Sequence, residues 1–420
     1  MDKLVITPGK LKGEVKIPPS KSMAHRAVIC AALSKGKSKI TNIQFSDDII
    51  ATIEAMRALG AEIKMFDDYL EIDGGNIFSK NDAVINCNES GSTLRFMVPL
   101  ALVKEAKANF TGKGNLGKRP LTTYYEIFDR QGIEYSYKEG VLDLNVKGRI
   151  KGEEFPIRGD ISSQFISGLL FALPLLQEDS KIVITTELES KGYIDLTLSM
   201  LELFGIEVTN NDYKEFIIKG NQTYKATDYR VEGDFSQSAF FVVADALGSD
   251  ILIRDLNQNS LQGDKEVLDI VTRMGCRIVE EEGGIKIKAD KLVPTVIDAS
   301  QCPDIIPVLT VLAAVTEGTT KIINAERLRI KECDRITAIT TELNKLGAKV
   351  TELKDSMVVE GVSSLTGGLV HSWDDHRIAM SLAMAATYCT GEVILENPGC
   401  VKKSYPDFWE DYKALGGKIQ

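Results

Sequence analysis

The chain has few of the features that mark secreted, metal-binding or membrane-spanning proteins. Its seven cysteines are odd in number and form no Cys-x-x-Cys pair, which favours a reducing compartment over a disulfide framework. The three histidines, His25, His371 and His376, share no helical spacing with a carboxylate partner, so we expect no metal and no cofactor. The longest apolar run, 305–315, is too short to cross a bilayer, and the first residues do not resemble a signal peptide. These absences predict a cytoplasmic protein with no membrane partner.

The charge balance excludes a further class of partner. With 50 basic and 60 acidic residues, the chain has a net charge of −10. An acidic chain is a poor general binder of nucleic acids, so we expect no nucleic-acid partner. We also expect a monomer. In a chain of this net charge, a local cluster of basic side chains is therefore a possible binding site for anions.

A repeat of about seventy residues organises the 420 residues. In each copy an amphipathic helical pattern ends at a hydrophobic residue plus glycine, and two strand-like runs follow. In the first copy, residues 50–59 predict a helix, and residues 61–66 and 69–72 predict two strands. The glycines of the six copies suit helix C-terminal caps; they are Gly60, Gly132, Gly205, Gly275, Gly347 and Gly416.

The sixth repeat is incomplete, because only three residues follow Gly417. Residues 3–7 look like an unpaired strand of the missing type, so we place them in the last repeat. This arrangement predicts a discontinuous domain of residues 1–19 and 232–420, and an inserted domain of residues 20–231, with three repeats in each. About 210 residues are enough for each domain to bury a core of its own.

A second helix, apolar almost all round, recurs in each repeat and begins with a polar residue. Such helices belong in a domain interior, so three per domain would bring their N-termini to one face. Helix N-termini present unpaired amide donors and attract anions. The alternative is that each polar residue is an ordinary N-cap. The six polar residues are Ser22, Ser92, Ser163, Ser236, Asp304 and Asp375.

Basic residues beside these helix starts favour anion binding over simple capping. Lys21, Arg26, Arg95 and Arg377 lie in or next to the first turns. A cation there opposes the helix dipole at a cost of roughly 0.3–1 kcal/mol, which a bound phosphate or carboxylate reverses. Other basic residues lie in loops, namely Lys113, Lys118, Arg119, Arg327, Arg329, Lys331, Arg335, Lys402 and Lys403.

An ordered series of motifs along essentially the whole chain resembles the 5-enolpyruvylshikimate-3-phosphate synthase family. The motifs are PPSKSMAHRA, NESGSTLR, GKRPL, GDISSQF, ESKGYIDLT, VEGDFSQSAFF, LRIKECDRI, DDHRIAMS and CVKKSYPDF. The resemblance implies an α/β fold of two domains, built from six βαβαββ units as an inside-out barrel. It also implies transfer of the enolpyruvyl group of phosphoenolpyruvate to the 5-hydroxyl of shikimate 3-phosphate. In that reaction a tetrahedral intermediate releases phosphate, a step of the shikimate pathway to aromatic amino acids.

The resemblance also implies site residues, motif by motif. Asp304 is similar to the residue that receives the 5-hydroxyl proton, Glu332 to the residue that protonates the vinyl carbon, and Lys21 to a third catalytic group. The implied ligands of shikimate 3-phosphate are Lys21, Ser22, Arg26, Ser162, Ser163, Gln164, Ser190, Asp304 and Lys331, with Tyr193 as a further candidate. The implied ligands of phosphoenolpyruvate are Lys21, Gly91, Arg119, Gln164, Arg335, Arg377 and Lys403.

The two carboxyls also make chemical sense by themselves. Protonating an enol carbon and deprotonating a hydroxyl require carboxyl groups in different states. Lys331 and Arg335 would lower the pKa of Glu332, whereas burial would raise it, so both outcomes stay open. Phe96, where many relatives have proline, and Arg327, where several have asparagine, depart from the family. The resemblance therefore does not fix contacts there or the response to glyphosate.

Two other functions compete with this interpretation. The sister family that acts on UDP-N-acetylglucosamine has a reactive cysteine in its N-terminal half, but no cysteine lies between Cys87 and Cys276. That family also has Lys-Asn where this chain has Lys21 and Ser22. A non-catalytic anion-binding repeat protein would be favoured if Lys21, Asp304 or Glu332 were missing, and all three are present.

Overall fold

Residues 3–420, which a computed structural model describes, contain six copies of a β-α-β-α-β-β succession. The first three copies run β2 (Lys12–Lys16), α1 (Lys21–Leu33), β3 (Lys37–Thr41), α2 (Asp47–Ala58), β4 (Glu62–Met65), β5 (Tyr69–Asp73); β6 (Asp82–Asn86), α3 (Gly91–Ala101), β7 (Ala106–Thr111), α4 (Thr122–Gln131), β8 (Glu134–Ser136), β9 (Asp143–Gly148); and β10 (Glu154–Ile157), α5 (Ser163–Ala172), β11 (Ser180–Ile184), α6 (Lys191–Leu203), β12 (Val208–Asn211), β13 (Glu215–Ile218).

The last three copies follow the same succession, and β1 (Lys3–Thr7) completes the sixth. They run β14 (Tyr229–Arg230), α7 (Phe235–Ala246), β15 (Asp250–Arg254), α8 (Glu266–Arg273), β16 (Cys276–Glu281), β17 (Gly284–Ala289); β18 (Val296–Asp298), α9 (Ile306–Ala314), β19 (Thr319–Ile323), α10 (Arg335–Lys345), β20 (Lys349–Glu352), β21 (Met357–Glu360); and β22 (Gly368–His371), α11 (His376–Ala386), β23 (Val393–Glu396), α12 (Phe408–Ala414), β24 (Lys418–Ile419). The six repeats confirm the predicted α/β fold.

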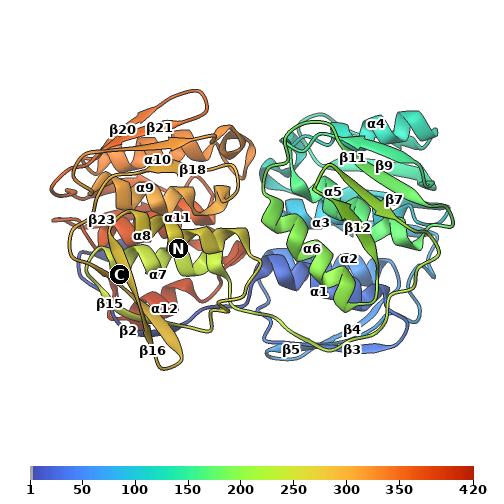
Figure 1. Ribbon diagram of the computed structural model, residues 1–420, viewed down its shortest axis with the longest axis horizontal. Coiled ribbons are helices and arrows are strands. Elements are labelled where there is room, and N and C mark those ends of the chain that lie inside the picture. Colours follow the sequence, from blue (N-terminus) through green and yellow to red (C-terminus); the bar gives the residue numbers. More distant parts are fainter. Residues whose placement is uncertain (1–2) are drawn as a thin grey trace. The chain divides into compact units, whose positions relative to one another are not determined.

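The chain divides into two compact units, each with its own hydrophobic core (Figure 1). One unit contains Met1–Pro18 and Gly233–Gln420, and the other contains Pro19–Glu232. No helix within residues 3–420 is long and apolar enough to cross a membrane.

The strands of residues 3–420 form six four-stranded sheets. In the sheet β6-β7-β9-β8, the first two strands are parallel and the others antiparallel, and the sheet β18-β19-β21-β20 repeats this pattern. Strand β1 pairs antiparallel with β23 and β24, with Leu4 opposite Leu395 and Ile6 opposite Ile419. The N-terminal strand thus supplies the strand that the sixth repeat lacks.

Two repeats exchange their first strands. Strand β14 of the fourth repeat pairs with β3 in the sheet of the first repeat, and β2 of the first repeat pairs with β15 in the sheet of the fourth. The chain passes from one unit to the other just after β2 and again just after β14. Each passage therefore follows a strand that is hydrogen-bonded into the unit the chain leaves.

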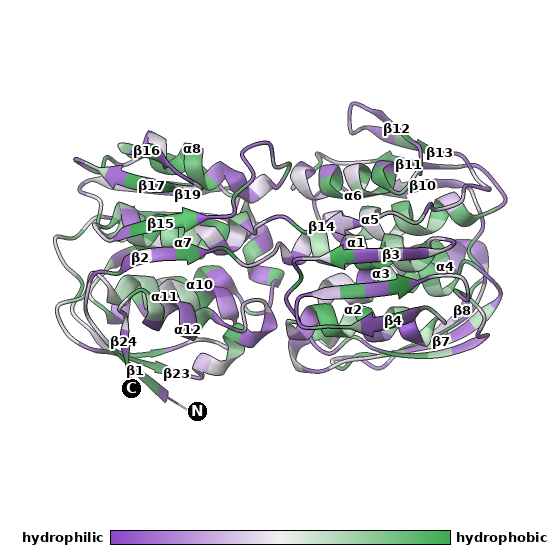
Figure 2. Cartoon of the chain, turned by 90° about the horizontal axis from the view of Figure 1, so that it is seen from below, coloured by the Kyte–Doolittle hydropathy of each residue, from purple (hydrophilic) through white to green (hydrophobic). Residues whose placement is uncertain are grey.

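The two helices of a repeat differ in burial, as their sequence patterns predict. Every residue of α7, α9 and α11 is buried. In α8, by contrast, only Val267, Ile270 and Val271 are buried, at the spacing of a single helix face. Within each unit the sheets lie outside the buried helices (Figure 1), and strands such as β4 alternate hydrophilic and hydrophobic residues (Figure 2).

The six repeat glycines all adopt positive φ, between 70° and 112°. This conformation ends the preceding helix at little steric cost only for glycine. At Gly60 a Cβ would also lie 2.4 Å from the carbonyl oxygen of Asn76. Glycine therefore recurs because the helix ends require it, which explains why it carries the repeat signal.

Candidate active site

The N-terminal turns of the buried helices are capped by residues other than those the sequence pattern indicated, Asp375 excepted. The side chains of Ser20, Ser90, Ser162 and Asp234 accept the capping hydrogen bonds of α1, α3, α5 and α7. The ordinary capping explanation is therefore wrong for the repeat serines, which lie one or two residues further on, inside the first turn. Asp304 lies in a 3-10 turn, η4 (Pro303–Ile305), before α9. The repeat serines are thus available for other contacts.

In the unit of residues 19–232, Lys21 and Arg26 join the start of α1 to neighbouring helices. The ammonium of Lys21 lies 2.8 Å from the carboxylate of Asp48 at the start of α2. Arg26 is buried and donates to the carbonyl oxygens of Ser22, at 2.7 Å, and Tyr193, at 2.9 Å. Burial lowers the pKa of Arg26 to about 10, so the guanidinium still carries its charge at neutral pH. These contacts fix a cationic cluster at the helix starts.

Gln164 links the first turns of α5 and α3. Its amide oxygen accepts a hydrogen bond from Arg95 at 2.8 Å, and its amide nitrogen donates to the hydroxyl of Ser92 at 2.9 Å. The predicted neighbours Ser162 and Ser163 begin the same helix. Both ends of the Gln164 amide are therefore oriented by other side chains at the helix starts.

Gly91, the first residue of α3, lies directly against arginine side chains. A Cβ added at Gly91 would be 2.5 Å from Nη1 of Arg119 and 3.1 Å from Nη1 of Arg95. Only glycine lets the Arg119 guanidinium approach the helix start this closely. The structure thus brings together two residues that the sequence placed in one ligand site.

Ser190 precedes α6 in the left-handed conformation, with φ of 55°, and it is fully buried. A non-glycine residue with positive φ carries backbone strain, and such strain is frequent at functional sites. Tyr193, three residues later, presents its carbonyl to Arg26. The α6 start therefore belongs to the same cluster as α1.

In the other unit, Arg335 is the centre of a group of carboxylates. Only 1% of its side chain is exposed. Its Nε donates to Asp375 at 2.8 Å, its Nη1 to Asp304 at 2.7 Å and its Nη2 to Glu332 at 2.8 Å. We call Arg335 with these three carboxylates the Arg335 cluster. The two carboxyls implied as proton acceptor and proton donor thus share one guanidinium.

The protonation of Asp304 is set by opposing effects. Burial opposes ionisation of its carboxyl, but the positive charges of Lys331, Arg335 and Arg377 hold its pKa well below the usual value. Lys331 donates to Asp304 at 3.2 Å, and burial lowers the pKa of this lysine. Asp304 is therefore ionised at neutral pH and can accept a proton.

Lys403 and Arg377 are the other basic residues of this unit that were predicted for the site. The ammonium of Lys403 lies 3.5 Å from Glu332. Arg377 is buried, and its Nη1 donates to the carbonyl oxygen of Ser236 at 2.9 Å. Its Nε has no hydrogen-bond partner among residues 3–420. A buried guanidinium with an unused donor suits an anionic ligand.

Three residues hold the predicted ones in place in ways that sequence reasoning did not foresee, and one of them, Asp48, it missed entirely. Asp48 pairs with Lys21, Arg95 orients Gln164, and Asp375 binds Arg335. The sequence did identify Arg95 and Asp375 as parts of repeated helix starts, but it did not give their partners. A search for buried carboxylates at every helix start would have found Asp48, which follows the N-cap Ser46 of α2.

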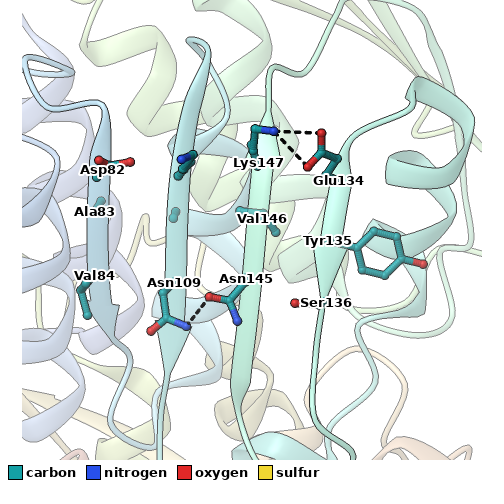
Figure 3. A pocket seen from close by; sticks show the side chains of 12 residues that line it. Asp82, Ala83, Val84, Asn109, Glu134, Tyr135, Ser136, Asn145, Val146 and Lys147 are labelled. Atoms are coloured by element: carbon teal, nitrogen blue, oxygen red, sulfur yellow. Dashed lines mark hydrogen bonds and ion pairs between the residues drawn. The ribbon is translucent and has the colours of Figure 1, made fainter.

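A hollow elsewhere on the inserted unit does not share these features. It measures about 490 Å³ and lies over the sheet β6-β7-β9-β8 (Figure 3). Two of its charged groups, Lys147 and Glu134, already form an ion pair across the sheet at 3.0 Å. None of the predicted site residues line it. Residues 3–420 also contain no group of three or more His, Cys, Asp or Glu side chains arranged to hold a metal ion.

The fold defines an α/β repeat protein with basic side chains gathered at helix starts, and comparisons with known proteins identify its family. A family model described as EPSP synthase (3-phosphoshikimate 1-carboxyvinyltransferase) matches residues 5–412. The 3-phosphoshikimate 1-carboxyvinyltransferase of Clostridium perfringens is 64% identical over 422 residues, covering 100% of both chains. That of Clostridioides difficile is 61% identical, covering 100% of this chain and 98% of the relative.

A solved EPSP synthase structure from Acinetobacter baumannii also matches the whole chain. It is 25% identical, has a TM-score of 0.82, and covers 100% of this chain and 99% of its own. The chain therefore belongs to the EPSP synthase family, the 3-phosphoshikimate 1-carboxyvinyltransferases. This membership confirms the resemblance that the sequence motifs indicate.

Proposed function

We propose that the chain transfers the enolpyruvyl group of phosphoenolpyruvate to the 5-hydroxyl of shikimate 3-phosphate and releases phosphate. Family membership over the whole chain supports this reaction. The observation that carries the proposal is the Arg335 cluster, where Asp304 and Glu332 are held side by side by one buried arginine. An addition and elimination at an enol carbon needs one group to take a proton and another to give one.

The anionic groups of the substrates match the cations at the helix starts. Lys21, Arg26 and the serines near α5 and α6 would hold shikimate 3-phosphate, with Lys331 and Asp304. Arg119 beside Gly91 would hold phosphoenolpyruvate together with Arg335, Arg377, Lys403 and the Lys21 ammonium. Arginine forks suit carboxylate and phosphate because they bind two oxygens at once.

The contacts of Asp304 suggest how substrate binding switches on the base. Arg335 and Lys331 both donate to Asp304, and their charges make it a weak base. When a substrate anion takes over one of these donors, the pKa of Asp304 rises toward that needed to accept the hydroxyl proton. Glu332, on the other side of the same guanidinium, would deliver the proton to the vinyl carbon.

A phosphate-release assay tests the proposed reaction. We expect release from phosphoenolpyruvate only when shikimate 3-phosphate is present, at a rate that a chelator leaves unchanged. The control acceptor is UDP-N-acetylglucosamine. Release with that acceptor, or activity that a chelator removes and added metal restores, would contradict the proposal.

A substitution at Gly91 tests the phosphoenolpyruvate site. Gly91→Ala should raise the KM for phosphoenolpyruvate by about tenfold and change kcat little, because the new methyl group displaces the Arg119 guanidinium. Arg119→Ala should have the same effect, since it removes the same charge-assisted contact. Gly9→Ala is the matched control, because a Cβ at Gly9 meets nothing within 4 Å. A KM that stays constant in both site variants would remove Arg119 from the binding site.

A monomeric state and a cytoplasmic location stay predictions of the sequence. Sedimentation equilibrium of the purified protein and fractionation of the source cells would test them directly.

A further inference from the structure

A further carboxyl, that of Asp264, is buried beside the predicted site and has no role in the reaction described above. Asp264 belongs to the 3-10 turn η3 (Gly263–Lys265), and only 2% of its surface is exposed. Its carboxylate accepts a hydrogen bond from the hydroxyl of Ser236 in the first turn of α7. Ser236 is one of the repeat serines that do not cap their helix, and its hydroxyl instead binds this carboxylate.

Ser236 also contacts Arg377. The backbone carbonyl of Ser236 accepts from Nη1 of Arg377 at 2.9 Å, while the backbone N–H of Arg377 donates to Asp375 at 2.8 Å. The turn that carries Asp264 is fixed to α7 a second time, because Gln262 accepts from the backbone N–H of Phe235 at 2.9 Å. The position of the Arg377 guanidinium therefore depends on the α7 start, which the Asp264 turn holds.

Asp264 also interacts electrostatically with two of the predicted site residues, Asp304 and Arg377. Burial and the negative charge of Asp304 raise its pKa to about 7, against the lowering effects of the Ser236 hydroxyl and the Arg377 charge. The other groups that face it are Asp234, which caps α7, and the Cys302 thiol before η4. The side chains of the next two residues in the chain have other partners: Lys265 donates to the Gln258 carbonyl, and Glu266 pairs with Arg273.

We propose that Asp264 is a positioning residue for Arg377, acting through Ser236, and that its charge competes with the anion that Arg377 binds. The inference rests on the proposed function, in which Arg377 holds phosphoenolpyruvate. A second negative charge next to the ionised Asp304 is unfavourable, and a bound anion adds a third. Anion binding therefore favours the protonated form of Asp264, and the affinity falls as pH rises and Asp264 ionises.

The test compares Asp264→Asn with the unaltered protein across the pH range in which Asp264 titrates. Asparagine can keep the hydrogen bond to Ser236 but stays neutral. The KM for phosphoenolpyruvate is measured from about pH 6 to about pH 8.5, with saturating shikimate 3-phosphate. The ratio of the unaltered KM to the variant KM should be close to one at the acid end. It should rise by up to about tenfold at the alkaline end, if anion binding raises the Asp264 pKa by about one unit.

Taking this ratio cancels the titration of the substrates themselves. Asp269→Asn, which removes a carboxylate from the exposed face of α8, is the matched control and should give a ratio of one throughout. A ratio for Asp264→Asn that does not vary with pH would mean that its charge is not felt at Arg377. It would contradict the inference even if the variant is less stable.

A second variant tests the positioning step separately. Ser236→Ala keeps the carbonyl that Arg377 uses but loses the link to Asp264. We expect a KM for phosphoenolpyruvate raised several-fold at every pH, with kcat nearly unchanged and the pH dependence retained. An unchanged KM would contradict the positioning role. Absence of phosphate release from the unaltered protein would contradict the proposed function and this inference together, whereas normal release with a flat ratio would contradict this inference alone.

Discussion

Arg335→Met should lower the free energy of unfolding by about 3–5 kcal/mol and reduce turnover by at least about 100-fold. Methionine has a similar length but no charge, so three carboxylates lose the guanidinium that they share. The Asp375 side chain is fully buried, and those of Glu332 and Asp304 are only 14% and 20% exposed. Removing one partner from a buried ionic group costs much more than the group contributes as a whole, because the remaining charges lose a strong counter-charge in a region of low polarity.

Urea-induced unfolding and steady-state kinetics together check this expectation. Arg254→Met is the matched control, because Arg254 also holds a carboxylate, Glu14 at 2.8 Å, but its side chain is 36% exposed. The control should lose at most about 1 kcal/mol and keep its activity. Arg335→Lys keeps the charge but cannot reach three carboxylates at once, so its stability should lie between the other two proteins. A stable and active Arg335→Met protein would show that the cluster neither holds the fold nor serves the reaction.

Glu332→Gln should reduce turnover by about 10²–10⁴-fold and leave the KM for phosphoenolpyruvate nearly unchanged. Glutamine keeps an oxygen that accepts the 2.8 Å hydrogen bond from Arg335, so the geometry of the cluster should persist. The amide cannot give up a proton to the vinyl carbon, and the loss is therefore confined to the chemical step. The expected kinetic pattern is the opposite of that for Arg119→Ala, which weakens ground-state binding.

Glu326→Gln provides the control for this experiment. Glu326 is exposed and begins the 3-10 turn η5 (Glu326–Ile330), which lies just before Glu332 in the chain. Its substitution should leave kcat and KM as they are. Thermal unfolding of Glu332→Gln near that of the unaltered protein would attribute the lost turnover to chemistry. Unchanged turnover in Glu332→Gln would remove this residue from the proton transfer.

The sequence alone determined the period of the fold and the burial of its helices. The repeat glycines were visible because a positive φ at each helix end admits few other residues, and all six adopt it. The buried helices were visible because a helix without a polar face must lie inside a core, as α9 and α11 do. The helix-ending glycine and the apolar helix surface are both local features, so a short stretch of sequence is enough to reveal them.

The order of the motifs along the chain determined the family, and the family determined the residues expected at the site. These motifs are easy to locate because most of them lie at helix starts, which recur with the repeat. Helix boundaries were less certain, since the expected helix at 50–59 begins instead at Asp47. The expected caps were displaced for a related reason. Several polar residues stand at each helix start, such as Ser20 and Ser22, and only the backbone conformation selects the one that caps.

Tertiary structure alone decided the pairings between distant segments. The exchange of β2 and β14 between two repeats follows from where the chain leaves each unit, and nothing within either strand expresses it. Likewise, the sequence placed Arg335 near Glu332 but could not show that Asp304 and Asp375 share the same guanidinium. The charge state of Asp304 depends on three cations brought together from separate segments, and that of Asp264 on its burial beside Asp304. Such electrostatic effects act through space, so they exist only once the chain has folded.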